Sequence, residues 1–160
     1  MTNRNNKSHL TYLKKGMKKT TKTIENIKAA IGKEEQLSPS PFMNWLKPVA
    51  VAAEYGSLTF EYKIRKEMTN PMGHLHGGVI AGIIDDIMGA TVYSLEKSDV
   101  FVTVNLSVDY FAPARLGDVV HAKTAVIKEG RNVINMACEL WLPAKKRLLA
   151  KASSNLLRLK

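Results

Sequence analysis

The sequence predicts an α+β fold in one domain, on the strength of two patterns. Residues 79–95 are apolar on almost every side, which is typical of a buried helix. Several segments with strand-like alternation follow one another across short turns, and consecutive hairpins make an antiparallel sheet. A chain of 160 residues can bury one sizeable core. We therefore expect one long central helix packed on about five mostly antiparallel strands.

The first quarter of the chain is expected to stand apart, as a basic N-terminal segment over residues 1–41 ahead of a single domain over residues 42–160. Apolar residues recur at three- and four-residue steps, which predicts a helix over residues 9–31. Gly32 is a plausible stop for that helix. The Pro/Ser sequence at 38–41 indicates a linker or turn.

The body begins with an expected short helix at Phe42, Trp45 and Leu46, packed on the domain. Apolar and polar residues then alternate in the predicted strands. These strands cover residues 58–65, 102–110, 118–128, 133–142 and 147–158. In the second of them, the alternation places Val102, Val104, Leu106 and Val108 on one face and Thr103 on the polar face.

The formal net charge of +10 is concentrated at one end of the chain. Residues 1–33 hold nine Lys or Arg and one acid, whereas residues 34–160 hold fifteen Lys or Arg and thirteen acids. The body is therefore nearly neutral, and one basic helix is too short for a helix-turn-helix, so we expect no specific nucleic-acid partner. We expect the apolar stripe of residues 1–33 to pack on the body, with weak contact to an acidic surface as the alternative.

The single cysteine, Cys138, excludes an intramolecular disulfide and a cysteine-based zinc site, and we expect it to be a buried thiol. No signal-peptide pattern or membrane-length apolar run is visible, so a cytoplasmic location is expected. His74 and His76 have the spacing of a metal pair without a clear third ligand nearby. We therefore expect no metal and no cofactor.

The stretch from Asn70 to Gly78, followed by Asp85 and Asp86, contains the candidate residues for chemistry. Gly77 and Gly78 lie where a loop enters the buried helix. Free N–H groups at a helix N-terminus favour developing negative charge, which makes an oxyanion site. The two glycines could equally serve only to shape a tight turn.

Two carboxylates lie in the middle of the apolar helix, and a buried carboxylate requires a partner or a function. Adjacent helical residues point about 100° apart, so Asp85 and Asp86 are expected to play different roles. His76 precedes Asp85 by nine residues, a rise of about 13.5 Å along a helix. One chain is not expected to bring both groups to one substrate atom, so a joint site needs a second subunit.

These motifs resemble the hotdog-fold acyl-CoA thioesterases, in the branch of the phenylacetate-pathway thioesterase and its animal relatives. The resemblance rests on Asn70, His76-Gly77-Gly78, Asp85, Thr103 and the segment from Tyr110 to Asp118, and it covers roughly residues 55–158. It implies a long helix wrapped by a curved antiparallel sheet, an acyl-CoA substrate, no cofactor, and a homodimer or homotetramer.

The resemblance also implies a role for each matching residue. Asp85 would be the catalytic carboxylate, acting as general base or as nucleophile. The N–H of Gly77 from the partner subunit would polarise the thioester carbonyl. Asn70 would position the water or the thioester, His76 would support the loop and assist the leaving thiolate, and Thr103 would orient water.

Gly78 and Asp86 are expected to lie beside the substrate. Asp86 is a departure from the family pattern, and its charge could raise the pKa of Asp85 by like-charge repulsion. Two other functions stay open. One is a hotdog hydratase or dehydratase, whose usual His and acid spacing is not found here. The other is a non-catalytic module that binds or senses acyl-CoA.

Overall fold

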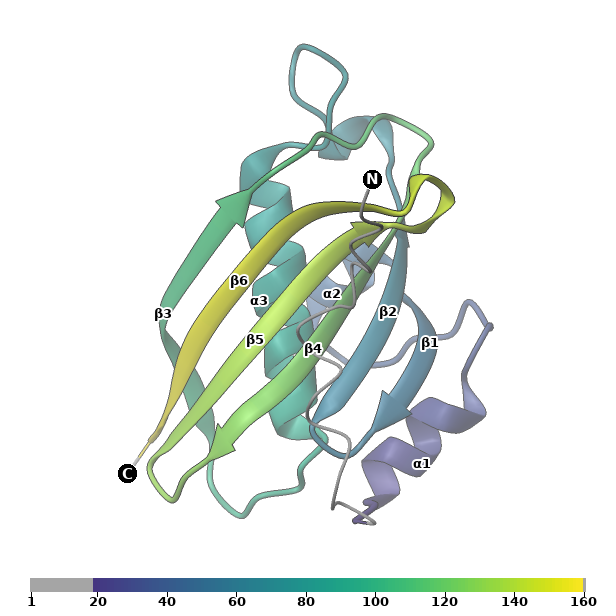
Figure 1. The fold of residues 1–160 in the computed structure, drawn as a ribbon. Helices are drawn as coiled ribbons and strands as arrows, with labels where there is room; N and C mark the ends of the chain where they lie inside the picture. The colour runs from purple at the N-terminus through teal and green to yellow at the C-terminus, as the bar shows by residue number, and fades with distance from the viewer. Residues whose placement is uncertain (1–18, 160) are drawn as a thin grey trace, which may run out of the picture.

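A computed structural model describes residues 19–159 of the chain. A curved six-stranded sheet wraps one long helix, α3 (Gly77–Tyr93), and every strand pairing is antiparallel (Figure 1). The strand order is β1-β2-β4-β5-β6-β3, so β1 and β3 are the two edges. The predicted α+β fold with one central helix is confirmed.

The strands are β1 (Val49–Glu54), β2 (Ser57–Lys63), β3 (Phe101–Tyr110), β4 (Val119–Glu129), β5 (Val133–Leu142) and β6 (Arg147–Arg158). Two shorter helices, α1 (Lys22–Ala29) and α2 (Pro41–Leu46), precede the sheet, and short 3-10 turns occupy Lys66–Met68 and Pro143–Lys145. The predicted strands, short helix and central helix therefore occur where the patterns place them. Strand β1 is an addition, because its sequence of Val and Ala lacks the polar alternation that marks a half-buried strand.

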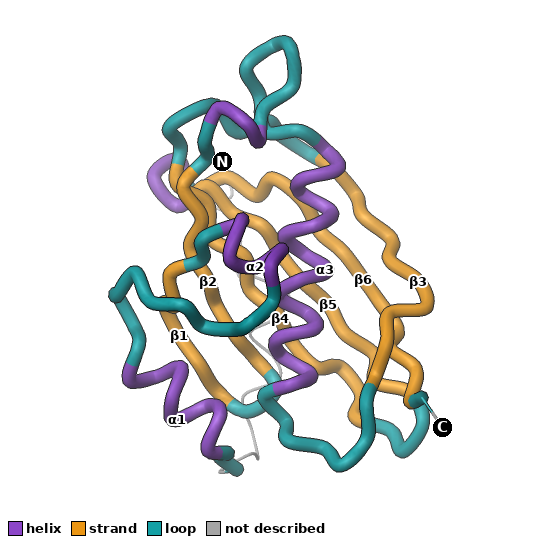
Figure 2. The backbone as a smooth tube through the Cα atoms, turned by 180° about the vertical axis from the view of Figure 1, so that it is seen from behind, coloured by secondary structure: helices purple, strands orange, loops and turns teal. Residues whose placement is uncertain are grey.

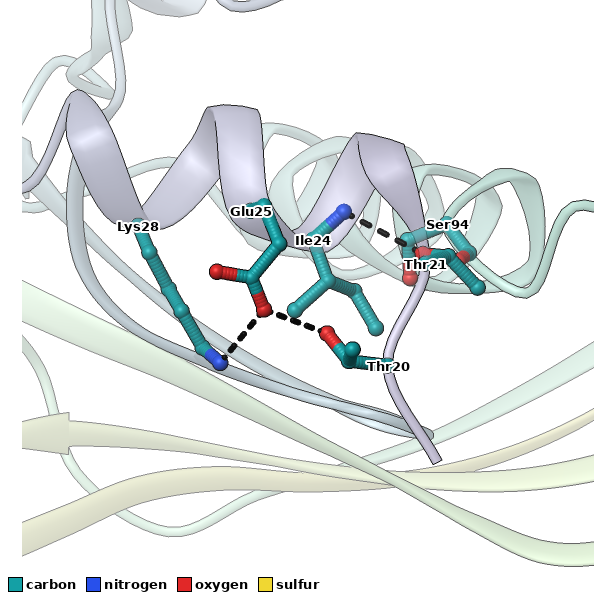
Figure 3. A network of polar contacts seen from close by, with 6 residues as sticks. All are labelled: Thr20, Thr21, Ile24, Glu25, Lys28 and Ser94. Atoms are coloured by element: carbon teal, nitrogen blue, oxygen red, sulfur yellow. Dashed lines mark hydrogen bonds and ion pairs between the residues drawn. The ribbon is translucent and has the colours of Figure 1, made fainter. Parts of the chain in front are cut away.

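Helix α1 begins later than the periodicity predicts. Thr21 has extended backbone, and its Oγ1 accepts a hydrogen bond from the N–H of Ile24 at 3.2 Å and donates to the carbonyl of Ser94 at 2.7 Å (Figure 3). This cap ends the helix on its N-terminal side, so the prediction of helix over residues 9–31 is wrong at 19–21. Its remaining N-terminal part, residues 9–18, lies outside the described residues.

The apolar face of α1 packs on the body as expected. Ile24 and Ile27 are buried and join the main core, and α1 lies along β1 (Figure 2). On the outer face, Glu25 accepts hydrogen bonds from Thr20 and Lys28 (Figure 3). No helix in the described part of the chain is long and apolar enough to cross a membrane.

Helix α3 supplies the centre of the core, but the sheet leaves one strip of it uncovered. Its core-facing residues are all fully or almost fully buried: Ile80, Ile83, Ile84, Ile87, Met88, Thr91 and Val92. The remaining strip runs along Gly82, Asp85 and Gly89, which are half-buried, to the exposed Tyr93. The expectation that this helix is buried on every side is therefore wrong within a single chain. Figure 2 shows that this side, away from β4 and β5, is the one against which α2 lies.

Strand β3 contains a β-bulge that changes which residues face the helix. Its register against β6 shifts between Thr103 and Asn105, so Val104 is the extra residue. Phe101 packs on the core before the bulge and Leu106 after it, whereas Val104 is 55% exposed. The uniform alternation expected over residues 102–110 is therefore wrong at its start, because a bulge reverses the inward face.

Candidate active site

Two of the predicted site residues are in direct contact. Asp85 lies at the middle of α3, and the Oγ1 of Thr103 on β3 donates a hydrogen bond to its Oδ1 at 2.8 Å. The bulge at Val104 gives Thr103 the inward orientation that this contact needs. Asp85 is half-buried, so one of its oxygens is fixed by protein while water can still reach the carboxylate.

The N-terminus of α3 presents backbone N–H groups at the surface. Among the described residues, the N–H of Gly77 has no hydrogen-bond acceptor, and the N–H of Gly78 donates to Nδ1 of His76 at 2.9 Å. The hydroxyl of Tyr110 donates to the carbonyl of Gly77 at 3.1 Å, which ties the end of β3 to this turn. Tyr110 belongs to the motif from Tyr110 to Asp118, but its position in the sequence does not predict this contact.

His76 is the N-cap of α3. Since its Nδ1 accepts from Gly78, the neutral ring carries its proton on Nε2. The side chain is exposed, so this N–H can serve as a donor. A Cβ at position 78 would lie 3.1 Å from Nδ1 of His76, so glycine keeps this cap uncrowded.

Asn70 shapes the loop before the helix. Its Oδ1 accepts from the N–H of Met72 at 3.0 Å and from the N–H of His74 at 3.1 Å. The amide oxygen is therefore occupied, and only the NH2 group remains to meet a substrate. The N–H of Leu75 donates to the carbonyl of Ala114 at 2.8 Å, which holds this loop against the loop that follows β3.

Asp86 is half-buried on the helix turn beside Asp85, and its Oδ2 is buried with no hydrogen-bond partner among the described residues. Burial, together with the charge of Asp85, raises the pKa of Asp86 to about 6. The charge of Asp85 is thus the second cause of this shift, after burial. Tyr62 is fully buried, its hydroxyl has no partner within residues 19–159, and burial followed by the charge of Asp86 raises its pKa well above 10.

This burial gives a stability prediction for Asp86→Asn. A carboxyl whose pKa is higher in the folded state than in the unfolded one stabilises the fold when protonated, and that benefit is lost as the pH rises from about 4 to 6. At pH 8 the neutral amide should raise the free energy of unfolding by roughly 1–2 kcal/mol, since water screens part of the full effect. Urea unfolding at pH 8 and pH 4 measures it, and the gain should disappear at pH 4.

The control for this prediction is Glu54→Gln, which removes an acid from the exposed end of β1. It should change the stability by less than about 0.5 kcal/mol at either pH. An Asp86→Asn chain that is no more stable than the wild type at pH 8 contradicts the prediction.

The candidate groups fall into two places in one chain. Gly77 and Asp85 lie on the same uninterrupted helix, eight residues and therefore about 12 Å apart along its axis. Thr103 joins Asp85, whereas Tyr110, His76 and the loop of Asn70 gather at the helix N-terminus. The described chain thus holds two separate groups of candidate residues.

In the part of the chain that the structure describes, no three His, Cys, Asp or Glu side chains lie close enough together to hold a metal ion. Cys138 is buried as expected, and burial followed by the charge of Glu139 raises the pKa of its thiol well above the usual range. That thiol stays protonated and unreactive.

The chain is similar to known proteins in both sequence and fold. Residues 72–147 match the Thioesterase superfamily. Acyl-coenzyme A thioesterase 13 of Homo sapiens is 30% identical over 105 residues, which are 66% of this chain and 75% of that protein. A phenylacetic acid degradation-related protein from Ralstonia eutropha has a solved structure that is 28% identical, with a TM-score of 0.68, over 76% of this chain and 92% of that one.

A third similarity concerns the fold alone. A Streptococcus mutans protein solved with acetyl-CoA bound has a TM-score of 0.65 at 23% identity, over 70% of this chain and 88% of that one. The architecture is therefore that of the hotdog thioesterases, one helix wrapped by a curved antiparallel sheet. The chain belongs to the thioesterase superfamily. Its class is that of the thioester hydrolases.

Proposed function

We propose that this chain hydrolyses acyl-CoA thioesters to a free carboxylate and CoA. The observation that carries the proposal is the hydrogen bond from Thr103 to Asp85 on the uncovered strip of α3. A half-buried carboxylate with one oxygen fixed and one free is arranged to receive a proton from water. The similarity to human acyl-coenzyme A thioesterase 13 supports acyl-CoA as the substrate class.

In the proposed reaction, Asp85 takes a proton from a water molecule that attacks the thioester carbonyl carbon. A carbon–oxygen bond forms, and the N–H of Gly77 stabilises the negative charge on the carbonyl oxygen. The carbon–sulfur bond then breaks, and the thiolate of CoA receives the proton. Asn70 lies in the loop before this helix end and His76 is its N-cap, and we propose that the NH2 group of Asn70 positions the thioester and the Nε2–H of His76 assists the thiolate.

A second mechanism keeps the same residues and makes Asp85 the nucleophile. Its carboxylate would attack the carbonyl and form a mixed anhydride, which water then hydrolyses. A single turnover in H2(18)O tests the nucleophile route. Labelled oxygen in the side chain of Asp85 shows an anhydride whose Asp85 carbonyl is attacked by water, whereas the general-base route places the label only in the product.

We further propose that each site is completed by a second copy of the chain. Gly77 and Asp85 of one chain are too far apart to act on one carbonyl group. Within the described residues, β3 is an edge strand that pairs only with β6, and its side chains Val104 and Tyr110 are 55% and 53% exposed. Such an edge is suited to pairing with another strand. Antiparallel pairing of β3 with β3 of a second chain would bring Asp85 of one chain to Gly77 of the other, in a homodimer or a homotetramer.

The test of the function is a thiol-release assay over a panel of acyl-CoAs of different length, branching and polarity. We expect measurable kcat/KM for at least one thioester, with light scattering reporting an even number of subunits. Tight binding of acyl-CoAs without release of any thiol would favour the non-catalytic binding module. Hydration of an enoyl-CoA without thiol release would favour a hydratase.

A further inference from the structure

Helix α2 carries an aromatic pair directly beside the candidate catalytic strip. Phe42 and Trp45 are stacked, with ring centroids 5.9 Å apart and an interplanar angle of 19°. They are 46% and 38% exposed, so part of each ring is available at the surface. Figure 2 shows α2 against the side of α3 that faces away from the sheet.

Phe42 fills the space above Gly82 of α3. A Cβ built at Gly82 would lie 2.8 Å from Cζ of Phe42, so this ring rests on the helix backbone itself. Gly82 is one turn before Asp85, and side chains three residues apart on a helix are about 5–6 Å from each other. The edge of the Phe42 ring therefore lies within about one side-chain length of the carboxylate.

The opposite direction along the strip is open. Gly89 is one turn after Asp85, and a Cβ built there would meet no atom within 4 Å. From Asp85, the strip is therefore closed on the Gly82 side by an aromatic ring and unobstructed on the Gly89 side. The closed side ends in an apolar wall, the ring of Phe42 with Trp45 stacked on it.

The aromatic wall is held in place from behind. The guanidinium of Arg65 lies 5.5 Å from the ring centroid of Trp45 and donates hydrogen bonds to the backbone carbonyls of Trp45 and Leu46. Met43 and Leu46 are buried in the core. Trp45 is thus fixed by Arg65, and Phe42 is fixed between Trp45 and Gly82.

We propose that Phe42 is the residue that limits acyl-chain length on this site, with the acyl group lying along the strip between Asp85 and the Phe42 ring. This inference rests on the proposed thioesterase function. An acyl group is apolar and gains most from an apolar, aromatic wall. Because the ring closes the space about one helical turn from the carboxylate, short acyl groups fit in front of it and longer ones meet it.

The test is Phe42→Ala assayed with a series of straight-chain acyl-CoAs from C4 to C12. Removal of the ring should raise the ratio of kcat/KM for C12 over that for C4 by about tenfold, because additional methylenes become buried. Phe42→Leu should give a smaller shift in the same direction. Both variants should fold, since Met43, Leu46 and Arg65 hold α2 and Phe42 is half-exposed.

The matched control is Ile127→Ala on β4, which truncates an exposed apolar residue of another element and should leave the ratio unchanged. An unchanged ratio in folded Phe42→Ala, with wild-type thiol release intact, overturns the role of Phe42 alone. Absence of thiol release by the wild type across the whole panel overturns the proposed function instead.

Discussion

Replacing Asp85 with Asn should lower kcat for acyl-CoA hydrolysis by about a thousandfold, as expected for loss of a general base. Asparagine has the same shape and can still accept the hydrogen bond from Thr103, which is 2.8 Å in the wild type. It cannot accept a proton from water or form an anhydride. The change therefore removes the chemistry while leaving the packing of α3 intact.

The measurement is thiol release at saturating acyl-CoA, using the substrate that the wild type hydrolyses best. Circular dichroism should match the wild type, and urea unfolding should show no loss of stability, because the change keeps the shape of the side chain and removes a like charge beside Asp86. A folded Asp85→Asn chain that releases thiol at the wild-type rate would rule out Asp85 as base or nucleophile.

Two substitutions of Thr103 test the hydrogen bond to Asp85 separately from the carboxylate itself. Thr103→Val removes the hydroxyl at nearly constant shape and should lower kcat by about tenfold, because Asp85 loses its only side-chain partner among the described residues. Thr103→Ser keeps the donor and should retain most of the rate. An equal loss in both variants would mean that packing at this position, rather than the hydrogen bond, affects the rate.

The sequence was sufficient for most of the architecture, for local reasons. Helix α3 has an apolar run too long for a strand, and the hairpins joining β4, β5 and β6 have turn residues between alternating segments. Such signals lie within ten to twenty residues of chain. They do not depend on how the sheet curves or on which element covers which face.

The differences arise where tertiary contacts override a local pattern. Strand β1 was missed because Val and Ala carry no alternation, yet pairing with β2 and cover from α1 make it a strand. The bulge at Val104 could not be read from a segment that alternates uniformly in sequence. The cap at Thr21 depends partly on the carbonyl of Ser94, which is 73 residues away in sequence.

In the candidate site, too, the sequence identifies residues, whereas their contacts depend on the tertiary structure. The resemblance named Asp85 and Thr103 separately, and the hydrogen bond between them emerges only from the folded structure, so the roles of both residues stay predictions. The orientation of Asn70 was not foreseeable, because its Oδ1 is taken by two backbone N–H groups of its own loop. Nor could the sequence show that the pKa of Asp86 is raised to about 6, since burial is the main cause.

Replacing Gly77 with Pro should lower kcat by about a hundredfold or more, which is the typical effect of losing one oxyanion donor. Proline removes the backbone N–H and is compatible with the backbone conformation at this position. Gly77 is the first residue of α3, a position that proline favours. His76 before it has φ −66° and ψ 136°, a conformation suited to a residue preceding proline.

Gly77→Ala is the matched comparison, because it adds a side chain and keeps the N–H. Its Cβ would lie 3.7 Å from the ring of Tyr110, an ordinary contact, so the variant should lose much less activity than Gly77→Pro. Similar losses in the two variants would mean that the space around Gly77, rather than its N–H, is what the reaction needs.

The same variant tests whether the site is shared between subunits. Asp85→Asn and Gly77→Pro chains carrying different affinity tags can be co-expressed, and the mixed dimer isolated by two successive tag purifications. If each site takes Asp85 from one chain and Gly77 from the other, one of the two sites in the mixed dimer has both groups intact. The mixed dimer should then show about half of the wild-type rate, although both parents are nearly inactive. If both groups came from one chain, every site would lack one of them, and the mixed dimer would be as inactive as its parents.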